Sequence, residues 1–418
     1  MNKLVTTTLG EVTNNYDNVR IPLSVKQRET IAKKYRYYGA QGVIDYVDNY
    51  LFDGEYILVA EDGENLKSQK NNLCNFVTGR FWVNNHAHII NASNGHDTKY
   101  LYYKLSLVNF RNYVTGSAQP KLTKDNLNSI VLHLHRESEQ QKIAAVLSAL
   151  DAKIDCNNRI NAELEAMAKT LYDYWFVQFD FPFDFASGKP AQNGKPYKSS
   201  GGKMVYNPAL KREIPAGWKA GTLDDLGQIV GGSTPSTKNP DNFTTDGTPW
   251  ITPNDLSDNQ GNKFITRGAQ DVSDDGLKGA SLKKYPAGTV LLSSRAPIGY
   301  MAIARYELTT NQGFKSFIPT NGYTTAFIYY TVKNSLNAII QYASGSTFKE
   351  ISATVLKTVK ISLPDSNVVG QFSNSVEPIF KRQDLLEQEN QHLTQLRDWL
   401  LPMLMNGQVT VAEGEAGS

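Results

Sequence analysis

The clearest pattern along this chain is a heptad repeat of apolar residues that occurs twice. In both segments apolar side chains recur at alternating steps of four and three residues over about five heptads, which is typical of a helix that packs along a seam against another helix. The side chains expected in the first seam are Ile143, Leu147, Leu150, Ile154, Asn161, Leu164 and Leu171, and those in the second are Phe372, Val376, Ile379, Leu386, Asn390, Leu393 and Leu400. The pattern predicts two long helices that cover each other's apolar edges.

The polar positions in these seams indicate how the two helices pair. Asn161 and Asn390 stand at matching positions 229 residues apart, and a polar residue in a seam usually fixes register and orientation. We expect an antiparallel pair, because the first helix must carry the chain from one globular half to the other. Each helix of about 38 residues would be about 57 Å long, and Pro378 should kink or restart the second. The alternative is two unrelated amphipathic helices, each packed on its own domain.

Segments of the first half recur in the second half in the same order. The matching ranges are 8–12 with 222–226, 52–59 with 286–293, and 116–134 with 345–363. The offset between the copies changes along the chain, so the copies differ by insertions in their middles. These patterns predict an α+β protein with two similar mixed α/β domains, joined by two long antiparallel coiled-coil helices in a pseudo-two-fold repeat.

A stretch rich in Gly, Pro and Ser between Ser187 and Gly202 predicts a linker or an exposed loop. Together with the two helices and the repeat, this stretch gives the expected domain boundaries. They are a first globular domain at 1–136, a central helix at 137–180, a linker at 181–210, a second globular domain at 211–364, a distal helix at 365–408 and a flexible tail at 409–418.

Composition narrows the class of protein. The 418 residues are 40% hydrophobic and 20% charged, which excludes collagen, fibrous repeats and long disordered tails. Only two cysteines are present, Cys74 and Cys156, so we expect a reducing compartment and no disulfide framework. The sequence contains no long apolar run and does not begin with a signal peptide, which favours a cytoplasmic protein with no membrane association.

Charge is unevenly distributed, although the chain as a whole carries only +2. Residues 1–136 contain 16 basic and 12 acidic side chains, and residues 200–364 contain 17 and 12. The helical segments are acidic, with 4 basic and 8 acidic residues in 137–180 and 3 and 8 in 365–418. Basic domains favour contact with a phosphate backbone, whereas acidic helices would be repelled by it.

Signals of catalysis are weak. The sequence contains no G-x-S-x-G elbow and no H-E-x-x-H motif, and it lacks a phosphate-binding loop with the required spacing. His86 and His88 could supply two imidazoles to a metal ion, but their counterparts in the second half are not ligands, which favours a structural role. We therefore expect neither an enzyme active site nor a metal site in this chain.

Two stretches combine cations, aromatic rings and amides in the way that nucleic-acid-binding surfaces do. They are 33–42 in the first domain and 231–240 in the second. The candidate DNA contacts are Lys33, Lys34, Arg36, Tyr38, Gln41, Lys121, Lys238, Lys263, Arg267, Arg295, Lys315 and Lys349. For any one of these residues the alternative is an ordinary solvated cation or a packed tyrosine.

The order of several short motifs resembles that of a known family, the specificity subunits of type I restriction–modification enzymes. The motifs are 37–43 (YYGAQGV), 53–60 (DGEYILVA), 139–144 (EQQKIA), 214–218 (IPAGW), 232–236 (GSTPS) and 249–256 (PWITPNDL). The resemblance extends over nearly the whole chain. His135 departs from it, since the family usually has proline before the first helix.

This resemblance implies a non-catalytic DNA-recognition subunit. Each of two target-recognition domains would read one half of a bipartite double-stranded DNA sequence. The helix pair would set the spacer and dock two modification (methyltransferase) subunits. Restriction and translocase subunits would join them, and S-adenosylmethionine, ATP and Mg²⁺ would bind to these partners, with no cofactor in this chain.

Two other functions are compatible with the pattern. One is a coiled-coil scaffold whose two domains bind protein or carbohydrate, which would suit the small net charge and the absence of a recognised DNA-binding helix motif. The other is a specificity subunit of a different restriction class.

Overall fold

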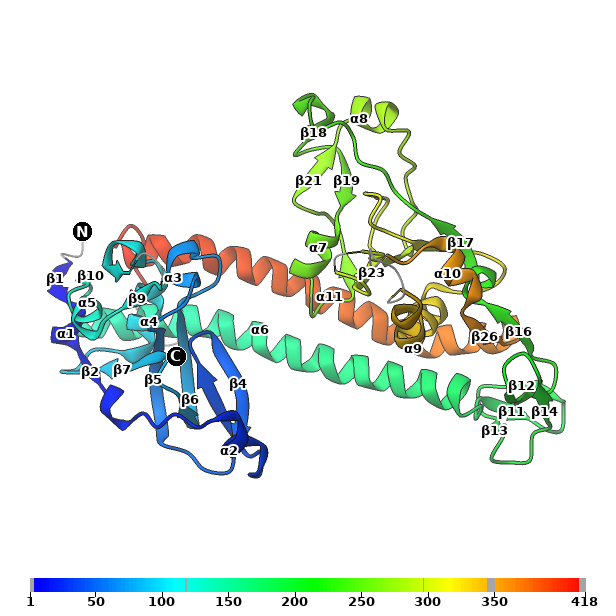
Figure 1. Ribbon diagram of the computed structural model, residues 1–418, viewed down its shortest axis with the longest axis horizontal. Helices are drawn as coiled ribbons and strands as arrows, with labels where there is room; N and C mark the ends of the chain where they lie inside the picture. The colour runs from blue at the N-terminus through cyan, green and yellow to red at the C-terminus, as the bar shows by residue number, and fades with distance from the viewer. Residues whose placement is uncertain (1–3, 117–118, 296, 344–349, 413–418) are drawn as a thin grey trace, which may run out of the picture. The chain divides into compact units, whose positions relative to one another are not determined.

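The computed structural model describes residues 4–116, 119–295, 297–343 and 350–412 (Figure 1). The chain forms two compact units: unit 1 comprises 1–155 and 390–418, and unit 2 comprises 156–389. Both long helices contribute residues to both units.

Unit 1 is built on a six-stranded sheet with the order β2-β7-β5-β6-β3-β4. Neighbouring strands are antiparallel except β3 and β6, which are parallel. The strands are β2 (Thr13–Asn15), β3 (Tyr35–Gly39), β4 (Gly42–Val47), β5 (Phe52–Ala60), β6 (Cys74–Val83) and β7 (Ala87–Ala92). The remaining elements before the long helix are β1 (Val5–Thr8), α1 (Leu9–Val12), η1 (Asp17–Val19), α2 (Val25–Glu29), α3 (Asn65–Ser68), α4 (Thr98–Ser106), η2 (Phe110–Tyr113), β8 (Val114–Thr115), β9 (Lys121–Leu122), α5 (Lys124–Asn128) and β10 (Val131–Leu134).

The central strand β5 shows why this sheet has two apolar faces. Successive side chains of a strand point to opposite faces, so Ile57 and Leu58 enter different clusters. Ile57 packs with Tyr100 of α4, whereas Leu58 packs with Phe81 on the other face. The sheet is therefore buried on both faces at its centre.

Unit 2 contains two larger sheets. The first has the order β17-β25-β22-β23-β20 and the second the order β18-β21-β19-β24. Their strands are β17 (Gly227–Val230), β18 (Phe243–Thr244), β19 (Thr248–Ile251), β20 (Phe264–Ile265), β21 (Gln270–Val272), β22 (Val290–Leu292), β23 (Met301–Ala304), β24 (Thr309–Thr310) and β25 (Ser316–Pro319). Further elements are β16 (Lys219–Thr222), η4 (Leu223–Leu226), η5 (Pro240–Asn242), α7 (Pro253–Asp258), α8 (Asp274–Gly279), α9 (Thr325–Ala343), α10 (Ala353–Thr358) and β26 (Lys360–Leu363).

The predicted internal repeat is confirmed by the strand order. The strands β2-β7-β5-β6-β3 of unit 1 correspond to β17-β25-β22-β23-β20 of unit 2, and in both sheets only the last of these pairs is parallel. An antiparallel pair closes each domain, β1 with β10 and β16 with β26. Both closing pairs lead into a capping box, Thr8 with Glu11 and Thr222 with Asp225.

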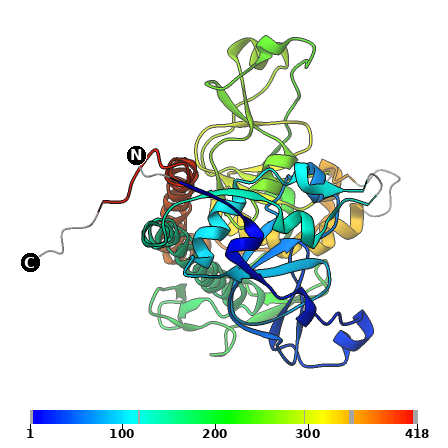
Figure 2. The same ribbon diagram turned by 90° about the vertical axis from the view of Figure 1, so that its left-hand side faces the viewer.

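The central segments of the two domains differ, as the changing residue offset between the two copies predicts. Unit 1 has the β3–β4 hairpin and α2, whereas unit 2 has its second sheet, which together with α8 projects away from α11 (Figures 1 and 2). Part of the repeated segment, residues 117–118 and 345–349, lies outside the described residues.

The two long helices are α6 (Glu137–Tyr172) and α11 (Ser366–Met405). In unit 1 the Arg397 guanidinium lies 2.9 Å from Asp151, and Figure 2 shows these parts of the helices side by side. In unit 2 Asn157 Nδ2 donates to Glu389 Oε2 (2.8 Å) and the Tyr172 ring lies against Phe372. Later positions on α6 therefore meet earlier positions on α11, so the helices are antiparallel. All fourteen predicted seam side chains are buried or half-buried.

Two predictions about the helices were wrong. Pro378 does not interrupt α11, which is continuous from Ser366 to Met405. Proline removes one backbone hydrogen bond to the residue four positions earlier. Pro378 and Asn374 are both exposed, so water can replace that bond. The central helix ends at Tyr172 rather than at 180, and Asp173–Val177 continues it as one π-helical turn.

The predicted linker 181–210 is instead folded. It contains a three-stranded sheet, made of β11 (Pro182–Asp184), β12 (Lys189–Pro190) and β13 (Lys195–Pro196). It also contains the strand β14 (Met204–Asn207), which pairs with β15 (Arg212–Pro215) just beyond it. Phe181 stacks on Tyr197 with ring centroids 4.7 Å apart and on Trp218 at 5.4 Å. A Cβ at Gly194 would lie 2.4 Å from the Phe183 nitrogen, so the glycine permits a close approach between strands. Gly188 and Gly201 lie in turns, whereas Pro190 and Pro196 lie in strands beside the aromatic side chains.

Candidate nucleic-acid interface

The first predicted stretch lies on and beside β3. Lys33 Nζ is 2.8 Å from Asp45 Oδ1, and Arg36 donates to the Thr78 carbonyl oxygen (2.8 Å). Gln41 is exposed in the turn between β3 and β4, where Gly42 has a φ of +126°. Since glycine adopts such a φ without strain, it allows the tight turn that presents Gln41 to solvent.

A group of cations and tyrosine rings lies next to β3, and we call it the Arg80 cluster. It consists of Lys34, Tyr35, Tyr50 and Arg80. The Arg80 guanidinium lies 4.8 Å from the Tyr50 ring centroid and Lys34 Nζ 5.0 Å from that of Tyr35, while the two rings are 5.2 Å apart. Hydrogen bonding with Lys34, and secondly with Arg80, lowers the pKa of Tyr35. Such a surface offers cations to phosphates and ring faces to sugars or bases.

Sequence reasoning missed Tyr50 and Arg80. Arg80 is on β6 and reaches the cluster only because β6 pairs with β3 and β5, where it faces Asp53 at 2.9 Å. The Gly79-Arg80 sequence has no local feature that distinguishes it from any exposed strand residue. Only the strand pairing could have identified it.

Tyr38 is a correction to the predicted site. Its side chain is buried, and its ring packs edge-on against Phe81 with centroids 5.7 Å apart. Alternation along β3 turns this ring into the sheet's core. Lys121 remains exposed, with Nζ 3.2 Å from Glu61 Oε1.

The second predicted stretch, 231–240, is a long loop fixed at its base. Tyr285 Oη donates to the Gly231 carbonyl oxygen (2.6 Å) and Trp250 Nε1 to that of Ser233 (3.1 Å). A Cβ at Gly232 would lie 1.7 Å from the Thr310 carbonyl oxygen, so only glycine fits there. The loop then presents Lys238, which is exposed.

The other candidates of unit 2 differ in their exposure and in their partners. Arg267 Nη1 lies 2.8 Å from Asp271 Oδ2 and donates to the Thr245 carbonyl oxygen (3.0 Å), which places it beside the second sheet. Arg295 and Lys315 are half-buried. Lys349 lies outside the described residues.

Lys263 is the second correction. It is only 4% exposed, and its ammonium lies 2.7 Å from Glu165 Oε2 of α6. The packing of the sheet against the helices removes it from the surface, so it is not available to a DNA phosphate.

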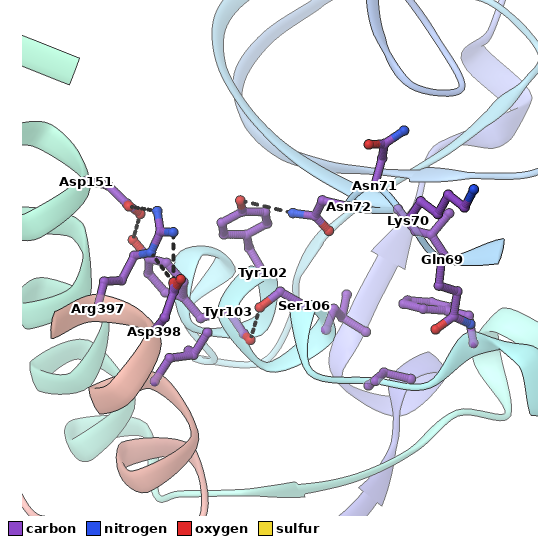
Figure 3. A pocket seen from close by; sticks show the side chains of 15 residues that line it. Gln69, Lys70, Asn71, Asn72, Tyr102, Tyr103, Ser106, Asp151, Arg397 and Asp398 are labelled. Atoms are coloured by element: carbon purple, nitrogen blue, oxygen red, sulfur yellow. Dashed lines mark hydrogen bonds and ion pairs between the residues drawn. The ribbon is translucent and has the colours of Figure 1, made fainter. Parts of the chain in front are cut away.

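A polar pocket of about 390 Å³ lies within unit 1 between α4, the segment 69–73 and the two long helices, which line it with Asp151 of α6 and with Arg397 and Asp398 of α11 (Figure 3). Its carboxylate Asp151 accepts a hydrogen bond from Tyr103 Oη (2.5 Å) and from Arg397 (2.9 Å). Arg397 also donates to Asp398. Burial, and then the hydrogen bond to Asp151, raise the pKa of Tyr103. The Asp151 carboxylate is thus paired with the Arg397 guanidinium, which is typical of a structural ion pair rather than of a nucleophile and its general base.

The two imidazoles of the possible metal pair have separate partners. His86 Nδ1 lies 2.7 Å from Asp62 and His88 Nδ1 2.6 Å from Asp17. In the part of the chain that the structure describes, no group of three or more His, Cys, Asp or Glu side chains could hold a metal ion. The search for membrane-spanning helices, restricted to the same residues, found none.

Comparison with known proteins gives the family. The family described as "Type I restriction modification DNA specificity domain" matches residues 1–166 and 215–395, which are the two repeated halves.

Among curated relatives, the MjaIX specificity subunit of Methanocaldococcus jannaschii is 39% identical over 42% of this chain and 42% of its own length. The HindI specificity subunit of Haemophilus influenzae is 29% identical over 69% of this chain and 71% of its own. The match to the first of these relatives thus spans less than half of that protein.

A solved structure supports the fold. The type I restriction–modification S subunit from M. genitalium has a TM-score of 0.62 at 15% identity, over 96% of each chain. With the match to both repeated halves, these findings show that the chain belongs to the type I restriction–modification DNA specificity family.

Proposed function

We propose that this chain recognises a bipartite DNA sequence as the specificity subunit of a type I restriction–modification complex, each unit reading one half. The observation that carries the proposal is that the main sheets of the two units share an order of five strands, while the segments inserted into that framework differ. The Arg80 cluster lies by the β3–β4 hairpin, and Arg267 lies by the second sheet of unit 2. Two domains that share a framework but carry different inserted segments suit the reading of two different half-sites.

The finer part of the proposal concerns the helix pair, which we take to be a coiled coil that sets the spacer and docks two methyltransferase subunits. Met167 of α6 and Leu396 of α11 stand at matching positions 229 residues apart, and they are 55% and 43% exposed. A large exposed apolar side chain repeated at one position of both helices suits two copies of the same partner.

We place the chemistry on the partner subunits. S-adenosylmethionine would bind to the methyltransferases, and ATP and Mg²⁺ to the restriction and translocase subunits. The chain itself would contribute recognition without a catalytic step, in the cytoplasm.

The primary test is a salt titration of binding to duplex DNA. Phosphate contacts release counterions, so the affinity should fall steeply and log-linearly with salt concentration. Arg80→Ala should weaken binding and lower the slope by about one. An affinity that is insensitive to salt would favour the scaffold that binds protein or carbohydrate.

The spacer is tested by deleting one heptad from both helices, which should change the separation of the methylated half-sites. Docking is tested with Met167→Glu and Leu396→Glu, which should weaken methyltransferase binding. The matched control is Val205→Glu, an equally exposed apolar residue on β14. An unchanged spacer, or equal effects of all three glutamates on docking, would contradict the roles given to the helix pair.

A further inference from the structure

Immediately before β20, Lys263 is a buried lysine that contacts three helices. Its Nζ lies 2.7 Å from Glu165 Oε2 of α6, and it donates to Gln383 Oε1 of α11 (2.6 Å) and to Tyr330 Oη of α9 (3.0 Å). The ammonium also lies 3.8 Å from the centroid of the Phe380 ring of α11. One side chain from the sheet of unit 2 therefore bonds to both long helices.

The backbone around Lys263 is attached to α11 as well. The Glu387 carboxylate accepts the N–H groups of Lys263 (2.7 Å) and Phe264 (3.0 Å). Arg305, which follows β23, donates to Asp384 (2.5 Å) and lies 3.4 Å from Glu387. The parallel strands β20 and β23 are thus tied to α11 at adjacent points.

The ion pair at the centre of this network is charged at neutral pH. Burial lowers the pKa of Lys263 to about 8, and Glu165 opposes that shift. Burial would raise the pKa of Glu165, but the ammonium groups of Lys263 and, secondly, of Lys333 together outweigh it and lower the pKa to about 2. A desolvated ion pair contributes little net stability compared with an apolar contact, but it is strongly dependent on geometry. Its best-attested use is to fix one arrangement among several.

The corresponding place in unit 1 is built differently. Tyr103 and Tyr330 match at an offset of 227, and Asp151 and Phe380 match at 229. The carboxylate of Asp151 is bonded to Tyr103 of α4 and to Arg397 of α11, so its partners lie on helices. In unit 2 the cation comes instead from the sheet.

The segment after β20 leads directly to the candidate recognition surface. Two residues beyond Ile265, Arg267 is bonded to Thr245 and Asp271. Asp271 lies on β21 of the second sheet, and its carboxylate also accepts the N–H of Gly247 (3.0 Å). A short, bonded path therefore runs from both long helices through Lys263 to the second sheet.

We infer that Lys263 is a positioning residue that fixes the recognition surface of unit 2 to the helix pair and so determines which half-site spacing the protein accepts. The inference rests on the proposed function. A change of one base pair in the spacer moves a half-site by about 3.4 Å along the duplex. A surface held at several points on two helices resists such a displacement, whereas a loosened one can follow it.

The test uses the full chain assembled with its methyltransferase subunits and Lys263→Met, which keeps most of the side-chain volume without the charge. Methylation is measured on duplexes in which both half-sites are constant and the spacer varies by single base pairs. The variant should reduce the preference for the best spacer over its neighbours by about tenfold, which corresponds to about 1.4 kcal/mol. The sequence of both half-sites should remain unchanged.

The matched control is Lys333→Met. Lys333 also pairs with Glu165 (2.6 Å), but it comes from α9 and leaves the attachment of β20 intact. Its spacer profile should equal that of the wild type. If Lys263→Met does not fold, Arg305→Gln removes the neighbouring attachment and should broaden the spacer profile in the same way.

The outcomes separate the inference from the function on which it rests. An unchanged spacer profile in a folded Lys263→Met or Arg305→Gln complex overturns the positioning role, as does equal broadening by Lys333→Met. A wild-type complex that methylates no bipartite site overturns the proposed function itself.

Discussion

Buried polar side chains in unit 2 have roles that their residue types alone do not indicate. Lys263 was predicted as a surface cation, yet it is enclosed by Glu165, Gln383 and Tyr330. In unit 1 Tyr38 was likewise predicted as a surface ring and lies in the core. The sequence around each residue is locally ordinary, because the atoms that enclose it come from segments distant in the chain. Residue-level contacts of this kind could not be predicted from one sequence.

Glu387 provides a test of this buried network through pH. Burial raises the pKa of its carboxyl to about 7, although bonds from the N–H groups of Lys263 and Phe264 oppose the shift. The folded protein therefore binds a proton between about pH 4.5 and 7 that the unfolded chain releases. This group's contribution to stability is fully present below the lower limit and is lost as pH rises towards 7, by at most about 3 kcal/mol.

The measurement compares the free energy of unfolding of the wild type and of Glu387→Gln at pH 5 and pH 7. The free energy of unfolding of the wild type minus that of Glu387→Gln should be larger at pH 5 than at pH 7. The reason is that only the wild type is stabilised by the proton that Glu387 binds at the lower pH. Other groups that titrate in this range cancel in the comparison. A difference that is the same at both pH values would show that Glu387 is not protonated in the folded state.

At the level of elements, periodicity predicted the helices better than composition predicted the loops. The helix starts are 229 residues apart, at Glu137 and Ser366, as the repeat requires. The linker prediction failed because Gly and Pro were given more weight than the aromatic residues between them, which pack as Phe181 does on Tyr197 and Trp218. A heptad seam can be recognised because its pattern repeats over many residues. A small aromatic core depends on contacts among a few residues, which form no repeating pattern in the sequence.

A substitution of Leu147 tests whether the predicted seam of α6 is a packed interface. Leu147 is fully buried in the same cluster as Ile143 and Leu404, so Leu147→Ala should remove apolar contact and leave a cavity. We expect a loss of about 2–5 kcal/mol in the free energy of unfolding of unit 1 in urea. Val131→Ala, at an exposed position on β10, should change it by no more than about 0.5 kcal/mol. Similar losses in the two variants would mean that Leu147 does not belong to a packed seam.

For the whole molecule, the repeat explains how the two globular domains can be independent. The antiparallel pair β16–β26 aligns Lys219 with Leu363, so the chain enters and leaves the globular part of unit 2 at adjacent points. The pair β1–β10 does the same in unit 1 by aligning Val5 with Leu134. The repeated framework could be predicted from the sequence because both copies carry it. The inserted sheet of unit 2 could not, because it has no second copy for comparison.

This closure predicts that the recognition domains are exchangeable. Replacing residues 219–363 by the corresponding segment of another member of the family keeps the β16–β26 pair at the junction. It should change one half of the methylated sequence to that of the donor and leave the other half and the spacer unchanged, provided that the donor segment carries counterparts of Lys263 and Arg305. Sequencing of methylated DNA from cells expressing the chimera measures both halves at once. Replacing residues 5–134 instead should change only the other half, and a chimera that alters both halves would show that the two units do not read DNA independently.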